Sequence, residues 1–307
     1  MKNSKNNYSA AQRWYNIKRR FLYQVKKQKR VLINIIKTPQ GIVGTFIIAG
    51  LILCALAGPW ITPQDPFKIV IANRFAPPSF KYLLGTDFLG RDILSRIIIS
   101  TRVVVPISLS VIAIIIIVGM TSGMVAGYYS NTIVEKIIIW MFDSINTFPG
   151  IILVLTLAAI VGSSSKIVLI LLMSLWRFPG YGRIVRVETL SVKEEVYIKA
   201  AQALGVKEKG ILFHHIMPNV IAPIIVLAGM DFGVVTMMLA GLSFLGMGVQ
   251  PPACSLGRML QEGYVYIHQS SWMLVGPILA LSVVMIGCSL FSAGLRIALN
   301  PKESFGR

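Results

Sequence analysis

Residues 41–61 read GIVGTFIIAGLILCALAGPWI and contain no charged residue. A helix needs about 20 mostly apolar residues to cross the hydrocarbon core of a membrane, and this run is long enough. Comparable apolar runs occupy residues 103–128, 137–161, 220–249 and 272–299. The pattern predicts an all-α, polytopic membrane protein.

The composition points the same way. The chain has 307 residues, of which 55% are hydrophobic and 14% are charged, whereas soluble domains carry about 25% charged residues. A net charge of +18 would suit nucleic-acid binding if it formed a basic patch on a soluble surface. Here the charges lie between apolar runs, so we expect a lipid membrane around the chain and no nucleic-acid partner.

A sixth span is harder to recognise. Residues 167–176 form an uninterrupted apolar run between Lys166 and Arg177, about half the length that a span requires. Snorkelling of the flanking charges could extend it. With six spans and the N-terminus inside, the basic residues of the 177–218 segment are cytoplasmic, whereas five spans would place them outside.

Orientation follows from the basic residues. The first 40 residues contain eleven Lys and Arg residues and no Asp or Glu, which predicts a cytoplasmic N-terminus. Attraction of this tail to anionic lipid is a weaker alternative role. A cleavable signal peptide would have an apolar core of about 7–15 residues, so we expect the 41–61 run to remain in the mature protein.

These observations divide the chain into five parts, with both termini cytoplasmic. The parts are a basic tail (1–40), a first transmembrane helix (41–62), an external loop with an amphipathic helix (63–100), a core of five transmembrane helices with a cytoplasmic loop at 181–219 (101–299), and a C-terminal tail (300–307).

The external loop carries a turn followed by a helix start. Apolar residues then recur at helical spacing over residues 93–98, against Arg91, Ser95 and Arg96, which predicts an amphipathic helix along the outer surface. A connector without chemistry is the alternative. The external-face motif consists of Gly85, Thr86, Asp87, Gly90, Arg91 and Asp92.

The cytoplasmic loop predicts two short helices. Residues 194–204 have helical periodicity and end at Gly205. A second stretch, 208–217, is expected to end at Pro218, because proline lacks a backbone N–H. Small residues such as Ala200 would let another protein approach closely, although these features alone also fit an ordinary folded loop.

The loop sequence KAAQALG at 199–205, followed by IMPN at 216–219, resembles the EAA loop of binding-protein-dependent ABC importer permeases. The branch it resembles is the dipeptide, oligopeptide and nickel branch, and within it the second, shorter type of permease. Three further stretches resemble that branch in the same order: LGTDFLGRD (84–92), LSFLGMGVQPP (242–252) and GLRIALNP (294–301).

The chain departs from the family pattern at four places. Lys199 stands where the general pattern has Glu, and Met217 where it has Leu. A Trp expected after residue 252 is replaced around Ser255, and the Asp before the terminal Pro is Asn300. The first two fall within the looser pattern of the peptide branch, and the last two weaken any transfer of substrate detail.

The resemblance implies a type I ABC importer permease fold in the cell membrane, working as half of a heterodimer. The implied partners are a second homologous permease, two ATPase subunits or domains, and an extracytoplasmic substrate-binding protein. The chain has no G-x-x-x-x-G-K-[ST] loop; we therefore expect no enzyme activity and no cofactor on this chain, with ATP and magnesium on the partner ATPase. The implied ATPase-docking residues are Tyr197, Ala200, Ala201, Leu204, Gly205, Ile216 and Pro218.

Two acidic residues, Asp143 and Asp231, fall inside the expected spans, where a carboxylate costs about 2.5–3.5 kcal/mol to insert. They could line the pathway or pair with the partner subunit. The resemblance implies transport of di- or oligopeptides or of a nickel chelate. A proton-coupled secondary transporter that uses both carboxylates is the alternative.

Neither catalytic nor metal-binding residues are expected on this chain. No H-E-x-x-H motif or clustered nucleophile with an acid/base pair occurs. His268 lies in an expected external loop, whereas His214 and His215 lie in the cytoplasmic one, so the three histidines cannot form one site.

Overall fold

The computed structural model describes residues 35–36, 38–162 and 165–299. Two of the predicted parts lie largely or wholly outside the described residues. These are the basic tail, of which residues 1–34 and 37 are not described, and the C-terminal tail at 300–307. Within the described ranges the chain is helical, and its only β-type pairing is an isolated bridge between Thr86 and Asp92. The all-α prediction is confirmed.

Five helices are long and apolar enough to cross a membrane, and a sharply bent pair makes a possible sixth span. The five are α2 (Pro39–Ile61), α3 (Ile93–Tyr128), α6 (Lys166–Lys193), the helical run Glu208–Phe244, which ends in α9 (Met217–Phe244), and α11 (Trp272–Leu299). The bent pair is α4 (Ile133–Asn146) and α5 (Gly150–Val161), whose axes meet at 88°. Shorter elements are η1 (Ile71–Asn73), α7 (Val196–Ala203), α8 (Glu208–Gly210), η2 (Ile211–Ile216) and α10 (Leu256–Val265).

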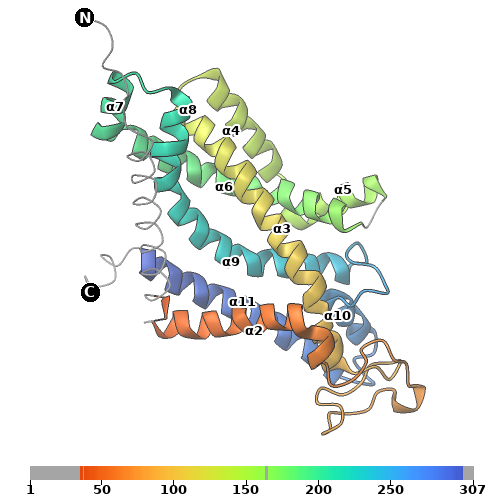
Figure 1. The fold of residues 1–307 in the computed structure, drawn as a ribbon. Helices are drawn as coiled ribbons and strands as arrows, with labels where there is room; N and C mark the ends of the chain where they lie inside the picture. Colours follow the sequence, from red (N-terminus) through yellow and green to blue (C-terminus); the bar gives the residue numbers. More distant parts are fainter. Residues whose placement is uncertain (1–34, 37, 163–164, 300–307) are drawn as a thin grey trace, which may run out of the picture.

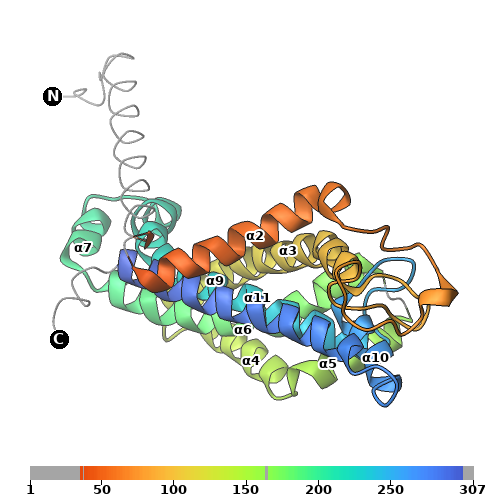
Figure 2. The ribbon, with the colours of Figure 1, turned by 90° about the horizontal axis from the view of Figure 1, so that it is seen from below.

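The long helix α3 crosses the bundle and contacts most of the other spans. Figure 1 shows α2 and α11 side by side, α6 crossing α3, and α4 on the side of α3 away from α2 and α11. Both Figure 1 and Figure 2 place α7 at one end of the bundle, whereas α10 and the 62–92 segment lie at the opposite end. The family-like stretch at 199–205, which begins in α7, therefore lies far from the one at 84–92.

Small residues bring α3 and α6 together. Gly119, Gly123 and Gly127 repeat every fourth residue along α3, so they share one face of the helix. A Cβ at Gly119 would lie 2.6 Å from the Cβ of Tyr181, and one at Gly123 would lie 2.4 Å from the carbonyl oxygen of Gly182. Only glycine permits this separation, as is common where helices pack within a membrane.

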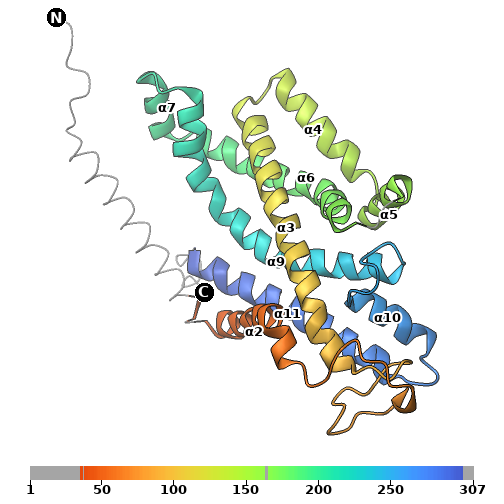
Figure 3. The ribbon, with the colours of Figure 1, turned by 45° about the vertical axis from the view of Figure 1, so that its right-hand side comes forward.

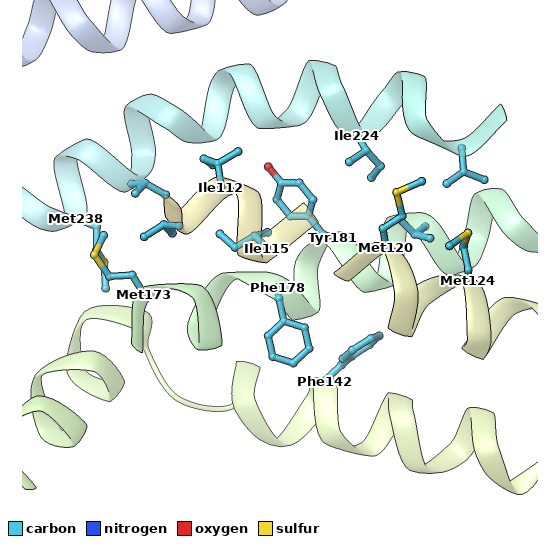
Figure 4. Close-up of a cluster of buried hydrophobic side chains, with 14 of the residues drawn as sticks. Ile112, Ile115, Met120, Met124, Phe142, Met173, Phe178, Tyr181, Ile224 and Met238 are labelled. Atoms are coloured by element: carbon cyan, nitrogen blue, oxygen red, sulfur yellow. The ribbon is translucent and has the colours of Figure 1, made fainter. Parts of the chain in front are cut away.

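The core lies where α3, α4, α6 and α9 meet. Figure 4 shows Tyr181, Phe178 and Phe142 of this cluster together with isoleucine and methionine side chains. The rings of Phe142 and Phe178 pack edge to face, with centroids 5.9 Å apart, a favoured geometry for aromatic pairs. This cluster packs the four helices α3, α4, α6 and α9 against one another.

The structure corrects the sequence-based boundaries of α6. The expected sixth span ended near Arg177, but the helix continues without a break to Lys193. Its arginines do not interrupt it, because each of three pairs with an acidic residue of a neighbouring helix. The segment between the spans therefore begins at Glu194 and not at 181.

Two further expectations are wrong in detail. The stretch at 91–98 is not a separate surface helix: α3 begins at Ile93 and runs unbroken to Tyr128, and its polar residues Ser95 and Arg96 are buried. Pro218 does not end a helix but lies in the first turn of α9, where a missing N–H costs nothing.

The span expected at 137–161 is also interrupted. It breaks between Asn146 and Gly150, at the Phe148–Pro149 pair, and the chain turns sharply there. Figure 3 shows α5 turned across the end of α4. Proline explains the break, because it cannot donate the hydrogen bond that would continue the ladder.

Candidate functional site

The segment from Glu194 to Ile216 forms a compact projection at one end of the bundle. Helix α7 ends with Leu204 as its C-cap, and Gly205 follows with a left-handed backbone, φ +75°. The N–H of Gly205 donates to the carbonyl of Gln202, and the N–H of Val206 donates to that of Ala201. This pair of bonds is a Schellman motif, which glycine favours because it lacks a Cβ.

The residues implied for docking divide into two groups. Tyr197, Ala200, Leu204, Gly205 and Pro218 are exposed, and Leu204 keeps 84% of its surface accessible. Ala201 and Ile216 are buried. Within this chain both side chains pack inward and hold the segment together from inside.

The segment exposes several large apolar side chains. Val196, Tyr197, Leu204, Val206 and Phe213 are all exposed large hydrophobic residues. Solvent-exposed apolar patches rimmed by polar residues mark contacts with another macromolecule. This segment therefore has the chemistry of a surface that contacts a protein or a membrane, and we name the five residues the α7 patch.

Three side-chain hydrogen bonds connect the segment to α9 and to the end of α3. The amide of Asn219 in α9 donates to the Tyr197 hydroxyl (3.1 Å) and to the carbonyl of His215 (2.6 Å). The hydroxyl of Tyr129, at the end of α3, donates to the Glu208 carboxylate (2.6 Å), and this bond raises the pKa of Tyr129. A force on α7 can thus reach α3 and α9 through short connections.

Three arginines of α6 form ion pairs along the helix. Arg177 binds both carboxylate oxygens of Asp231 in α9, at 2.8 Å from Nε and 2.6 Å from Nη2. Arg186 contacts Glu135 of α4 at 2.5 Å, and Arg183 pairs with Asp143 of the same helix. Pairing lowers the cost of placing these charges in a membrane.

The ion pairs change the interpretation of the two intramembrane aspartates. Asp231 is only 2% exposed and its two oxygens are both occupied by Arg177. Asp143 and Arg183 are both exposed, so this pair must face water or protein and not lipid. Each aspartate has its partner inside this chain, where the sequence suggested a partner subunit or a substrate.

The external-face motif forms a buried charge cluster at the opposite end of the bundle. Asp87 accepts hydrogen bonds from the N–H groups of Leu89 and Arg91, and its carboxylate contacts the guanidinium groups of Arg91 (2.7 Å) and Arg96 (2.5 Å). Arg96 also binds Glu262 of α10 at 2.9 Å. The cluster joins the 62–92 segment, α3 and α10.

The remaining motif residues shape the same segment. Asp92 caps α3 by accepting from the N–H of Ser95 at 2.8 Å. The hydroxyl of Thr86 is buried between Asn73 and Ala76. Gly85 and Gly90 have positive φ, and a Cβ on Gly90 would lie 1.9 Å from the Val70 carbonyl oxygen. These residues therefore build the loop and do not present a contact surface.

Sequence reasoning missed Arg96, Glu262 and Arg177 as members of charge clusters. Their partners are 9, 166 and 54 positions away in the sequence. A usable signal was present: residues 133–231 contain acidic residues in two apolar runs and three arginines in the segment between them. Matching the acids to the arginines would have predicted that α6 extends past Arg177.

Comparison with known proteins identifies the class of protein. Residues 115–304 match the model of the family described as binding-protein-dependent transport system inner membrane component. Residues 29–78 match the N-terminal transmembrane domain of oligopeptide transport permease C. These two regions together cover most of the chain.

Curated relatives agree over nearly the full length. A dipeptide transport system permease of Alkalihalophilus pseudofirmus is 37% identical over 266 residues, covering 87% of each chain. A glutathione transport system permease of Pectobacterium atrosepticum is 34% identical, over 84% of this chain and 85% of the relative. A di/tripeptide transport system permease of Pseudomonas aeruginosa is 33% identical, over 84% and 87%. The chain therefore belongs to the family of binding-protein-dependent transport system inner membrane components.

Proposed function

We propose that this chain is one of two permease subunits of an ATP-driven importer of di- or oligopeptides in the cell membrane. A second permease subunit completes the pathway, an ATPase pair binds at the cytoplasmic end, and a substrate-binding protein delivers peptide at the outer end. Family membership and the peptide transport named for the curated relatives support this assignment. A nickel chelate has no comparable support.

The observation that carries the proposal is the α7 patch. Its exposed hydrophobic residues belong to the Glu194–Ile216 segment, whose helix α7 lies at the end of the bundle opposite α10 and the 62–92 segment. An ATPase subunit would bury this patch. The hydrogen bonds from Asn219 and Tyr129 would then transmit its movement to α9 and α3.

In this arrangement the α7 patch is cytoplasmic, as are the two termini. The basic N-terminal tail supports that orientation. ATP and magnesium act on the partner ATPase, and this chain contributes no catalytic residue. Its task is to change shape when the ATPase does.

Co-purification tests the docking surface. Leu204→Glu places a charge in the α7 patch without touching the core, because the side chain is exposed. We expect the ATPase to be lost from the purified complex. Leu83→Glu is the matched control, since Leu83 is also exposed but lies in the 62–92 segment. Equal ATPase recovery from the two variants would remove the docking assignment.

Transport assays separate this function from proton-coupled transport through Asp143 and Asp231. Membrane vesicles with the full complex should import peptide when supplied with ATP, whether or not the proton gradient is collapsed. Both aspartates already form ion pairs with arginines of α6. Uptake that follows the proton gradient and persists without the ATPase would favour the secondary transporter.

A further inference from the structure

In the ion pair between Arg177 and Asp231, the aspartate is buried and the arginine is partly exposed. Asp231 binds the edge of the guanidinium formed by Nε and Nη2. The carboxylate is 2% exposed and each of its oxygens accepts one of these bonds. A transported molecule therefore cannot reach Asp231, whereas the side chain of Arg177 remains 30% exposed.

The open side of Arg177 still has donors. A guanidinium carries five N–H groups, and Asp231 uses one on Nε and one on Nη2. The N–H groups of Nη1 meet no acceptor among the described residues. The edge formed by Nη1 and Nη2 is therefore available to an acceptor from outside the chain.

Neighbouring residues hold this edge in place and leave space before it. The ring of Trp176 lies 5.7 Å from the guanidinium carbon, within range of a cation–π interaction. A Cβ added to Gly180, one turn further along α6, would lie 3.9 Å from Nη1 and would meet no other neighbouring group of the described chain within 4 Å. Nη1 thus points over Gly180 into open space.

The position of this edge in the membrane limits what can cover it. Arg177 lies about 17 Å along the axis from the start of α6 and about 24 Å from its end, at 1.5 Å per residue. Exposed guanidinium donors within a membrane-spanning helix cannot face hydrocarbon. They require water, protein or a transported molecule with acceptor atoms.

We infer that Arg177 is a binding residue for a carboxylate group of the transported molecule, such as the C-terminal carboxylate of a peptide. The Nη1 and Nη2 edge offers two parallel N–H groups, which match the two oxygens of a carboxylate. Asp231 keeps the arginine in position and neutralises it, so the second carboxylate binds weakly enough to be released. This inference rests on the proposed peptide import.

A matched pair of substitutions tests the site without breaking the ion pair. Gly180→Asp would place a carboxylate beside Nη1 and occupy the open edge, whereas Gly180→Asn adds a side chain of the same shape without the charge. The Cβ that both substitutions add meets only Nη1 of Arg177 within 4 Å. The probes are L-alanyl-L-alanine and its C-terminal amide, imported by vesicles that contain the full complex.

We expect Gly180→Asp to import the free peptide about tenfold more slowly than Gly180→Asn, because a like charge then opposes the substrate carboxylate. Import of the amide should differ by less than about twofold, as for most surface substitutions. The binding protein is the same in both variants, so its own selectivity cancels. Equal import of the free peptide by the two variants, or an equal loss for both peptides, overturns the assignment.

A second variant removes both charges. Arg177→Gln combined with Asp231→Asn leaves no unpaired buried charge, and its preference for the free peptide over the amide should be smaller than that of the wild-type complex, because the binding protein contributes equally to both. Retention of the wild-type preference would contradict the inference. If Gly180→Asp instead releases the second permease subunit in pull-down, a partner side chain occupies the edge and the site is wrong.

Failure of this inference is distinct from failure of the proposed function. A wild-type complex that does not import L-alanyl-L-alanine with ATP counts against peptide import itself. Normal wild-type import with no gap between the two Gly180 variants counts against the carboxylate site alone.

Discussion

The α7 segment and the 62–92 segment each carry a family-like motif, but they use its residues in opposite ways. In the 62–92 segment the motif is buried: Asp87, Thr86 and Asp92 are each at most 3% exposed, and each side chain accepts hydrogen bonds from its own chain. In the α7 segment most motif residues are exposed, and a Cβ added at Gly205 would meet no group within 4 Å. A buried motif builds the loop, whereas an exposed one is available to a partner.

The largest loss of stability should follow when a charge is removed from the buried cluster of the 62–92 segment. Asp87→Asn leaves Arg96 buried with only Glu262 as its partner. We expect a loss of about 3–5 kcal/mol of stability, as for other broken buried ion pairs, measured by thermal unfolding of the purified chain. Asp65→Asn is the control in the same segment, because Asp65 is exposed. Similar unfolding of both variants would show that the cluster does not hold the loop.

Two glycines with the same backbone conformation sharpen the comparison. Gly90 and Gly205 both have φ +75°, but a Cβ on Gly90 would collide with Val70, whereas one on Gly205 meets nothing within 4 Å. Gly205→Ala should cost about 1–2 kcal/mol for its left-handed backbone. Gly90→Ala should cost about 1–3 kcal/mol more, because of the added overlap.

Denaturation of the two alanine variants under identical conditions measures the difference. If Gly205→Ala were the more damaging of the two, the α7 segment would be as tightly packed as the 62–92 segment. Gly205→Asn is a useful third variant, since asparagine tolerates a left-handed backbone and should recover part of the loss.

The smallest effect is expected from a surface ion pair of the α7 segment. Lys199 contacts Glu194 at 2.8 Å, and this contact lowers the pKa of the Glu194 carboxyl. A lowered carboxyl pKa stabilises the folded state above the ordinary pKa of the group, and that contribution is lost as the pH falls through the lowered value. Lys199→Gln should return the pKa toward its ordinary value, as carboxyl NMR would detect.

The thermal stability of Lys199→Gln at neutral pH should stay close to that of the parent chain, because both side chains are exposed and the pair is screened by solvent. A marked fall would mean that the α7 segment depends on its own charges, as the 62–92 segment does. That result would remove the contrast between the two segments.

Several features of the fold were predictable because they depend on neighbouring residues. The apolar runs near residues 41–61 and 272–299 fall on α2 and α11, and the helix expected at 194–204 is α7. The failures involve distant contacts. Arg177 and Arg186 were interpreted as loop residues because the acids that pair with them lie more than 50 positions away in the sequence.

The candidate sites show the same division between features set by neighbouring residues and features set by distant contacts. The chain's sequence predicted the position of the α7 segment and its bounding Gly205, but burial removed Ala201 and Ile216 from the surface. It also indicated Asp231 as an unusual intramembrane charge. Only the three-dimensional packing assigned both carboxylate oxygens of Asp231 to Arg177 and left the other edge of that arginine open.

The sequence by itself determined the class of protein, the apolar spans and the four family-like stretches, because hydropathy and motifs are properties of short segments. The tertiary structure decided how far α6 extends, where the span at 137–161 breaks its direction, and which charged residues are accessible. The physical reason is that a charge in a membrane is tolerated according to its partner, and here the partners come from other helices.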